Sequence, residues 1–216
     1  MDVNTSEKEQ IENLKKWWKD NGSSLITGVL LGLTLLFGGK AWMNWKDTQA
    51  QNASNVYTQM QSALNQNNIE LARSQANELI SNHTSSGYAP LAALMLAKLE
   101  VQEGKLAAAQ GQLKWALEHA RTPQLTHISR TRLVRTLIDE KAYDQAETQL
   151  SQVADAGEYA AVYTELKGDL AFARGDTKGA AEAYREALAA LPPEAPNVTY
   201  LRVKYENIAG ADSVPQ

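Results

Sequence analysis

The residue types that usually carry out chemistry are few in this sequence, and their spacing fits no catalytic pattern. The three histidines are His83, His119 and His127, and no two lie four residues apart, the spacing at which a helix presents two metal ligands. The patterns GxSxG, HExxH and the P-loop are absent. There is no cysteine, which excludes a thiol nucleophile, a disulfide scaffold and a cysteine zinc site. We therefore predict a protein that is not an enzyme and that has no catalytic residues, metal or cofactor.

The charge balance argues against nucleic acid as a partner. Six of the 21 Lys and Arg residues and five of the 25 Asp and Glu residues lie in residues 1–46. Residues 47–216 therefore carry 15 basic and 20 acidic residues, a net charge of −5. Proteins that bind nucleic acid normally present the opposite charge on their working face. Binding of protein or lipid, with no small-molecule substrate, is the class of function that remains.

The element that decides where such binding takes place is the segment SLITGVLLGLTLLFGGKAWMNW, residues 24–45. No charged side chain occurs from Asn21 to Gly39, about 19 residues or roughly 28 Å of helix, which matches the hydrocarbon thickness of a bilayer. Four tryptophans bracket the run at the positions expected for the two membrane interfaces, and we predict them as interfacial anchors: Trp17, Trp18, Trp42 and Trp45. A core helix of a soluble protein gives no reason for this bracketing.

A cleaved signal peptide is the other interpretation of this segment. Gly39-Lys40-Ala41 imitates a cleavage site, but Trp42 follows it and the apolar run is longer than that of a typical signal. We therefore predict an uncleaved transmembrane helix over residues 23–45. Four lysines precede the run and two follow it, so the positive-inside rule favours a cytoplasmic N-terminus and an exported domain.

Two features flank or line the predicted anchor. Residues 1–22 are predicted as a cytoplasmic amphipathic juxtamembrane segment, in which residues 6–22 form a helix that Gly22 would end. This helix would bind lipid, a cytoplasmic partner, or both. Within the anchor, small residues repeat every fourth position on one helix face, where another membrane helix could approach closely: Ser24, Gly28 and Gly32. The alternative is that these small residues make no specific contact.

After Trp45 the sequence has the period of helices and repeats itself. Four segments align on an alanine, at Ala72, Ala109, Ala146 and Ala180, with spacings of 37, 37 and 34 residues. The last copy places further residues at the offsets of the tetratricopeptide pattern, and the segment resembles that motif: Gly168, Ala180, Tyr184, Ala187 and Pro192. We predict all of these except the proline as residues that pack helix on helix. An irregular helical bundle is the alternative.

Residues 46–209 are thus expected to form an α-solenoid of helical hairpins. The segment TYLRVKYENI, after the prolines near residue 192, would form a helix that caps the end of the stack. We expect residues 210–216 to form a disordered tail. The first helices of the hairpins would line a concave partner groove, for which the register selects Leu94, Lys98, Val101, Thr131, Arg135, Ile138, Glu165, Asp169 and Phe172. The alternative is a solvated helix face.

The segment EQIENLKKWWKDNG directly before a single anchor, followed by an alanine-rich repeat domain ending near Gly210, resembles the YfgM family. The resemblance covers essentially the whole chain. It implies a single-pass protein of the bacterial inner membrane with a periplasmic tetratricopeptide-like domain. It also implies association with the SecYEG translocon and the periplasmic chaperone PpiD, help in handing over newly exported client proteins, and a link to an envelope-stress regulator.

The fold class predicted from all of this is all-α: a juxtamembrane helix, one transmembrane helix and a tetratricopeptide-like solenoid with a capping helix. The predicted function is that of a non-enzymatic, membrane-anchored binding module at the translocon, and its other partner is the lipid bilayer. The alternative function is a homo-oligomeric structural or signalling scaffold that handles no clients.

Overall fold

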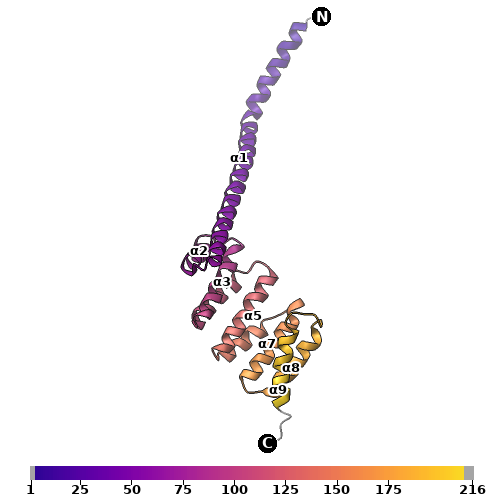
Figure 1. Ribbon diagram of the computed structural model, residues 1–216. Helices are drawn as coiled ribbons and strands as arrows, with labels where there is room; N and C mark the ends of the chain where they lie inside the picture. Colours follow the sequence, from indigo (N-terminus) through magenta and orange to yellow (C-terminus); the bar gives the residue numbers. More distant parts are fainter. Residues whose placement is uncertain (1–2, 212–216) are drawn as a thin grey trace. The chain divides into compact units, whose positions relative to one another are not determined.

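The computed structural model describes residues 3–211, and the side chains of residues 7–208 (Figure 1). Every regular element in this range is helical, so the predicted all-α class is confirmed. The chain divides into two compact units, Met1–Asn52 and Ala53–Gln216. Residues 212–216, which belong to the predicted disordered tail, lie outside the described residues.

The first unit is formed by the larger part of helix α1 (Val3–Asn65). Among the described residues, α1 is the one helix that is long and apolar enough to cross a membrane. The large apolar side chains of its apolar run lie outside any protein core: Leu33 is 43% exposed and Leu35 is 75% exposed. An apolar helix surface of this extent is what a lipid environment requires, so α1 fits the predicted transmembrane helix.

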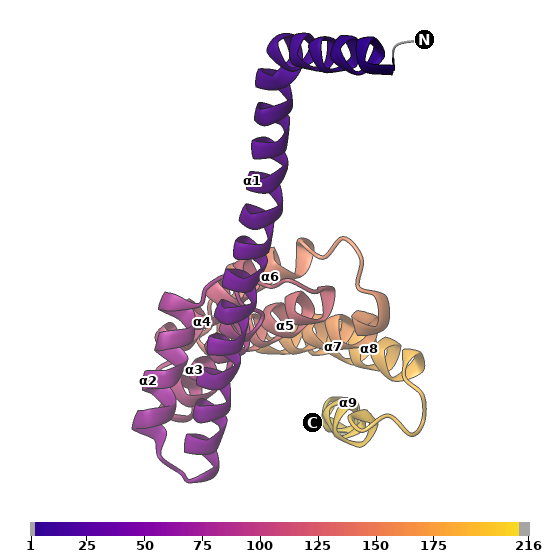
Figure 2. The ribbon, with the colours of Figure 1, turned by 90° about the horizontal axis from the view of Figure 1, so that it is seen from above.

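The predicted end of a helix at Gly22 is wrong, because α1 continues through this residue without interruption. The ring of Trp18 lies across Gly22, so that a Cβ atom added there would stand 3.2 Å from the ring. Figure 2 shows that α1 bends in its N-terminal part.

The second unit is a row of helical hairpins, as the repeat pattern predicts. The last turns of α1, from Ala53 onward, pack against α2 and α3. The next three hairpins pair α3 with α4, α5 with α6, and α7 with α8, and α9 packs on α8. The bounds of these helices are α2 Ile69–Asn82, α3 Tyr88–Gln102, α4 Leu106–Glu118, α5 Pro123–Asp139, α6 Tyr143–Ser151, α7 Ala160–Ala173, α8 Thr177–Ala190 and α9 Val198–Ala211, with a 3₁₀ turn at Gly157–Tyr159 before α7.

Each hairpin of the second unit turns in the same way. The chain enters the left-handed region once in each turn, at Asn67 (φ 56°), Gly104 (φ 72°), Lys141 (φ 61°) and Gly175 (φ 86°). The N–H of the following residue donates to the carbonyl five positions earlier, at 2.8 to 2.9 Å in all four turns. This bond ends each first helix by satisfying one of its last carbonyls. The turns therefore recur at the same spacing of 37, 37 and 34 residues as the aligned alanines.

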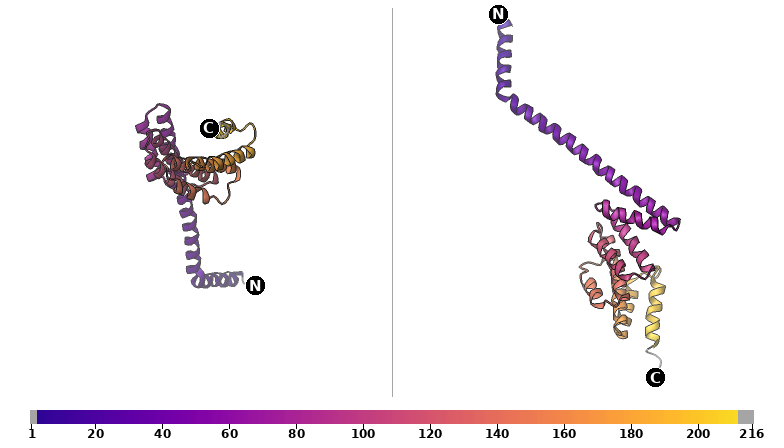
Figure 3. Two further views of the ribbon diagram at one scale, coloured as in Figure 1. Left: turned by 90° about the horizontal axis from the view of Figure 1, so that it is seen from below. Right: turned by 90° about the vertical axis from the view of Figure 1, so that its left-hand side faces the viewer.

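The C-terminal helix closes the row. Leu201 of α9 is fully buried, and with Ile208 it covers Ala180, Tyr184 and Ala187 of α8. Figure 3 shows α9, in yellow, at the opposite end of the helical row from α2. The predicted capping helix is thus present, and it extends through Gly210 and Ala211, two residues into the segment that was expected to be a disordered tail.

Candidate functional site

Two of the three histidines lie in local aromatic packing. His119 stacks on the ring of Trp115 with centroids 3.9 Å apart, and its Nδ1 lies 2.9 Å from the Trp115 carbonyl oxygen. His127 stacks on Tyr159, and its Nδ1 lies 2.9 Å from the hydroxyl of Tyr163. Within the described residues, no three His, Asp or Glu side chains gather as metal ligands would. His127 therefore joins α5 to the start of α7, while His119 packs on its own helix, α4.

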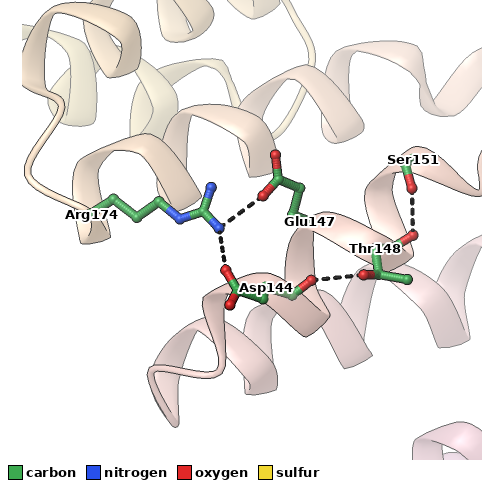
Figure 4. Close-up of polar contacts among 5 residues, drawn as sticks. All are labelled: Asp144, Glu147, Thr148, Ser151 and Arg174. Carbon is green, nitrogen blue, oxygen red and sulfur yellow. Dashed lines mark hydrogen bonds and ion pairs between the residues drawn. The ribbon is translucent and has the colours of Figure 1, made fainter.

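The acidic residues near the turn after α5 make contacts between neighbouring hairpins. Glu140 accepts a hydrogen bond from Gln110 of α4. Asp144 and Glu147 of α6 pair with Arg174 at the end of α7, at 3.0 Å and 2.8 Å (Figure 4). Figure 4 also shows the hydroxyls of Thr148 and Ser151 donating to carbonyl oxygens of their own helix, at Asp144 and Thr148. The acids at this turn thus link α4 to α5 and α6 to α7.

The residues predicted to contact other membrane helices are all exposed on α1. Ser24, Gly28 and Gly32 face solvent in the isolated chain, and no atom lies within 4 Å of a Cβ built at either glycine. The four tryptophans predicted as interfacial anchors, Trp17, Trp18, Trp42 and Trp45, are 49 to 65% exposed. The face and the anchors are therefore available to lipid or to a partner helix, and their contacts stay predictions.

The residues predicted to pack the repeats are all buried. The exposed fraction is 2% or less for Tyr184 and for the alanines Ala72, Ala109, Ala146, Ala180 and Ala187. Gly168 lies against Tyr184 so closely that a Cβ atom at residue 168 would stand 2.5 Å from the tyrosine ring. A missing side chain on α7 thus makes room for a large one on α8, and the two helices pack closely at this point.

All but one of the residues predicted for a partner groove line two neighbouring hollows. The first, here called the basic hollow, has a volume of about 460 Å³ and lies between α3, α4 and α5. Leu94, Lys98 and Val101 line it from α3, and Arg132, Arg135, Thr136 and Asp139 line it from α5. The buried Leu94 and Leu113 and the 42% exposed Val101 give it an apolar floor.

The second hollow, here called the α9 hollow, has a volume of about 560 Å³ and is lined from α5, α7, α8 and α9. Arg135 and Asp139 of α5 line both hollows, so the two adjoin. The predicted groove residues Ile138, Glu165, Asp169 and Phe172 all lie here. Phe172 is 53% exposed and Tyr200 of α9 is 64% exposed, so the hollow carries aromatic surface open to a partner.

Thr131 is the one predicted groove residue that lines neither hollow. It lies one helical turn before Arg135, but its side chain is only 6% exposed and its hydroxyl donates to the Ile128 carbonyl oxygen at 3.1 Å. The two hollows therefore do not extend to this turn of α5.

Helix α9 contributes residues to the groove that the sequence register did not identify. The ammonium of Lys204 lies 2.7 Å from Glu165 Oε1 and 2.7 Å from Asp169 Oδ1, both on α7. The Tyr184 hydroxyl donates to the same Asp169 oxygen at 2.7 Å. The ammonium also lies 4.9 Å from the centre of the Tyr200 ring, within range of a cation–π contact. A cation from the capping helix thus occupies the acidic part of the α9 hollow.

The environment of this cluster shifts two pKa values in the same direction. Burial lowers the pKa of Lys204, but its hydrogen bonds to Asp169 and Glu165 outweigh burial and raise the pKa above the ordinary 10.5. Burial, followed by the hydrogen bond to Asp169, raises the pKa of Tyr184 far above the ordinary 10.0. Both groups therefore hold their protons more tightly in the folded state than in the unfolded state.

We expect the repeat domain to lose stability at alkaline pH because of these two groups. Their contribution is fully present below the unfolded pKa values of 10.0 and 10.5 and is lost as the pH rises above them. Urea unfolding of a fragment covering residues 47–216, measured from pH 8 to pH 11, should show a falling midpoint. The Lys204→Met variant should fall less steeply than the wild type, and equal slopes would contradict the assignment.

Comparison with known proteins identifies a matching protein family and several similar proteins. The family model of the tetratricopeptide repeat-like domain matches residues 15–210. A protein of Escherichia coli (strain K12) named "Ancillary SecYEG translocon subunit" is 28% identical over 184 residues, which is 85% of this chain and 88% of that protein. Proteins of the same name are 28% identical in Haemophilus influenzae and 26% identical in Neisseria gonorrhoeae, over 87% and 96% of this chain and 91% and 100% of their own lengths. These findings confirm the resemblance predicted from the sequence.

Proposed function

Because the chain belongs to the tetratricopeptide repeat-like domain family over residues 15–210, we propose that it is a membrane-anchored, non-enzymatic subunit that associates with the SecYEG translocon. The observation that carries this proposal is that its relatives, which it matches over almost their whole length, are named ancillary SecYEG translocon subunits. The anchor and the repeat domain divide the work: α1 gives location, and the repeat domain binds other proteins.

The features of α1 support lateral association in the bilayer. A helix that exposes Ser24, Gly28 and Gly32 on one face lets another membrane helix approach closely, because small side chains allow backbone contact. The basic juxtamembrane residues, with four lysines before the apolar run, favour a cytoplasmic N-terminus in the bacterial inner membrane. In this orientation, the repeat domain lies in the periplasm beside the exit of the channel.

The groove on the repeat domain supports the binding role. Its two hollows combine an apolar floor, exposed aromatic rings and charged walls, which suits protein segments better than small polar molecules. We propose that the groove binds the chaperone PpiD or emerging client proteins, and that hand-over and the link to an envelope-stress regulator follow from this binding. Anchoring raises the effective concentration of the groove at the channel exit, so weak contacts suffice.

Photo-crosslinking in living cells tests the proposal. Leu31 lies seven residues, about two helical turns, after Ser24 and so borders the small-residue face, while Leu30 lies about 100° further round the helix, away from that face. A photoreactive residue at Leu31 should crosslink to subunits of the translocon, and one at Leu30 should do so much less. A third probe at Phe172 should crosslink to a periplasmic chaperone or to exported proteins.

The rival function is a homo-oligomeric scaffold, and the same experiment distinguishes it. Crosslinks from Leu31 only to a second copy of the chain would replace the translocon proposal by the scaffold. Labelling of Phe172 by cytosolic proteins would contradict the proposed orientation. If the probe at Leu31 crosslinks to the translocon and the probe at Phe172 crosslinks to no protein, the translocon association stands. The proposed binding of chaperone or client proteins by the groove is then contradicted.

A further inference from the structure

The basic hollow carries positive charge that the fold leaves without a partner. The side chains of Lys98, Arg132 and Arg135 line it, and none of them forms an ion pair or hydrogen bond with any residue that the structure describes. Asp139 is the one acidic residue in its lining. The hollow therefore has a net positive charge in a domain whose overall charge is negative.

Other cations of the repeat domain show what such groups do where an acid is within reach. Arg73 pairs with Glu100 and Glu103, and Arg174 pairs with Asp144 and Glu147 (Figure 4). These pairs join one hairpin to the next. Lys98, Arg132 and Arg135 lie instead around a hollow with an apolar floor, where their charges are available to a molecule that enters it.

The adjoining α9 hollow shows how the inner surface of the domain receives a charged side chain. There, Lys204 of α9 meets two carboxylates of α7, while Leu201 of the same helix is buried against α8. The contact combines an apolar anchor with a charge opposite to that of the wall. The basic hollow offers the same combination with the charges reversed, and it is open.

We propose that the basic hollow binds an acidic segment of a partner protein. An apolar side chain of that segment would lie on the floor formed by Leu94 and Val101, and neighbouring carboxylates would pair with Lys98, Arg132 and Arg135. The volume of about 460 Å³ fits one or two side chains of a peptide and is walled by three helices, which a flat lipid surface cannot enter. The inference rests on the proposed binding function of the repeat domain and names the chemistry of its partner.

The test uses the full chain in its membrane, with a photoreactive residue at Val101, which is 42% exposed in the hollow. Mass spectrometry identifies the crosslinked segments. They should carry Asp or Glu residues next to the crosslinked position. Crosslinks to neutral or basic segments, to lipid, or to a second copy of this chain would overturn the proposal, and so would the absence of any crosslink.

Charge reversal provides the second arm. The variant K98E/R132E/R135E should reduce the Val101 crosslink about tenfold to a hundredfold, since it removes three charge pairs and adds repulsion. The matched control K114E/K178E/R185E reverses three exposed cations that line neither hollow, and its yield should equal that of the wild type. An equal loss in both variants would attribute the effect to net charge and contradict the proposal.

Three further measurements keep the outcome specific. Circular dichroism of the variants checks the fold, and the neutral variant K98Q/R132Q/R135Q replaces the reversed one if the latter unfolds. Replacing the acids of the captured segment by lysine should restore its crosslink to the reversed variant. The crosslink from residue 31 to the translocon should be unchanged in every variant. If that crosslink is missing, the proposed translocon association is contradicted, and not the proposal about the basic hollow.

Discussion

Replacing Gly168 by valine is expected to lower the free energy of unfolding of the repeat domain by about 3 kcal/mol, near the upper end of the cost of overpacking a core. Even the first added carbon, the Cβ atom, would stand 2.5 Å from the ring of Tyr184 on α8. It would also stand 3.3 Å from the Cβ of Ala183 on the same helix, α8. Helices α7 and α8 would have to separate, which would also disturb the bond from Tyr184 to Asp169. Urea unfolding of residues 47–216, followed by circular dichroism, measures the change.

A second glycine in a helix of the same domain provides the control. Gly111 of α4 is exposed, and no atom lies within 4 Å of a Cβ built on it. Alanine at residue 111 should therefore raise stability by about 0.5 to 1 kcal/mol through the smaller entropy of the unfolded chain. If Gly168→Val cost no more than about 1 kcal/mol, the close packing of α7 on α8 would be refuted.

Replacing Lys204 by methionine is expected to cost about 3 kcal/mol, because it leaves two carboxylates of α7 without their cation. The side chain of Glu165 is only 5% exposed and that of Asp169 is 18% exposed, so neither can recover full hydration. Methionine keeps the length of the apolar stem, so the variant removes the charge and little of the packing. The urea midpoint of residues 47–216 at pH 7 reports the loss.

The cause can be separated from a general effect of removing a lysine. Lys105→Met breaks an exposed pair with Glu103, whose side chains are 62% and 40% exposed, and should cost less than about 1 kcal/mol. Adding E165Q and D169N to the Lys204→Met variant removes the stranded charges and should restore much of its stability. Equal losses in the two methionine variants would show that burial of the acids is unimportant.

The repeat packing could be predicted because it depends on spacing along the chain. Alanine at Ala109, Ala146 and Ala180 and glycine at Gly168 leave room for neighbouring helices, and these residues are buried as expected. The first helix of the first hairpin carries no comparable sequence signal, because it is the end of α1 and packs through small or flexible residues, Ala53, Met60 and Ala63.

The groove was predictable only in part. The helical register predicted Lys98, Arg135 and Phe172 as groove residues, and each of them lines a hollow, since they lie on the first helices of the hairpins. The contact of Lys204 with Glu165 joins residues 39 positions apart, and the side chains near Lys204 in the sequence give no sign of it. Thr131 shows the opposite error, because periodicity selects a face of α5 but not how far along it the groove extends.

The four matching hairpin turns give the repeat domain a unit that can be counted. Each turn uses one left-handed residue and one bond to a carbonyl five positions back, so each boundary between the two helices of a hairpin is chemically the same. Such a domain has a length that evolution or an engineer can change in whole steps, by duplicating or deleting one hairpin with its turn. The number of partner segments that the groove can bind would then change by whole numbers, while the anchor and the capping helix α9 stay unchanged.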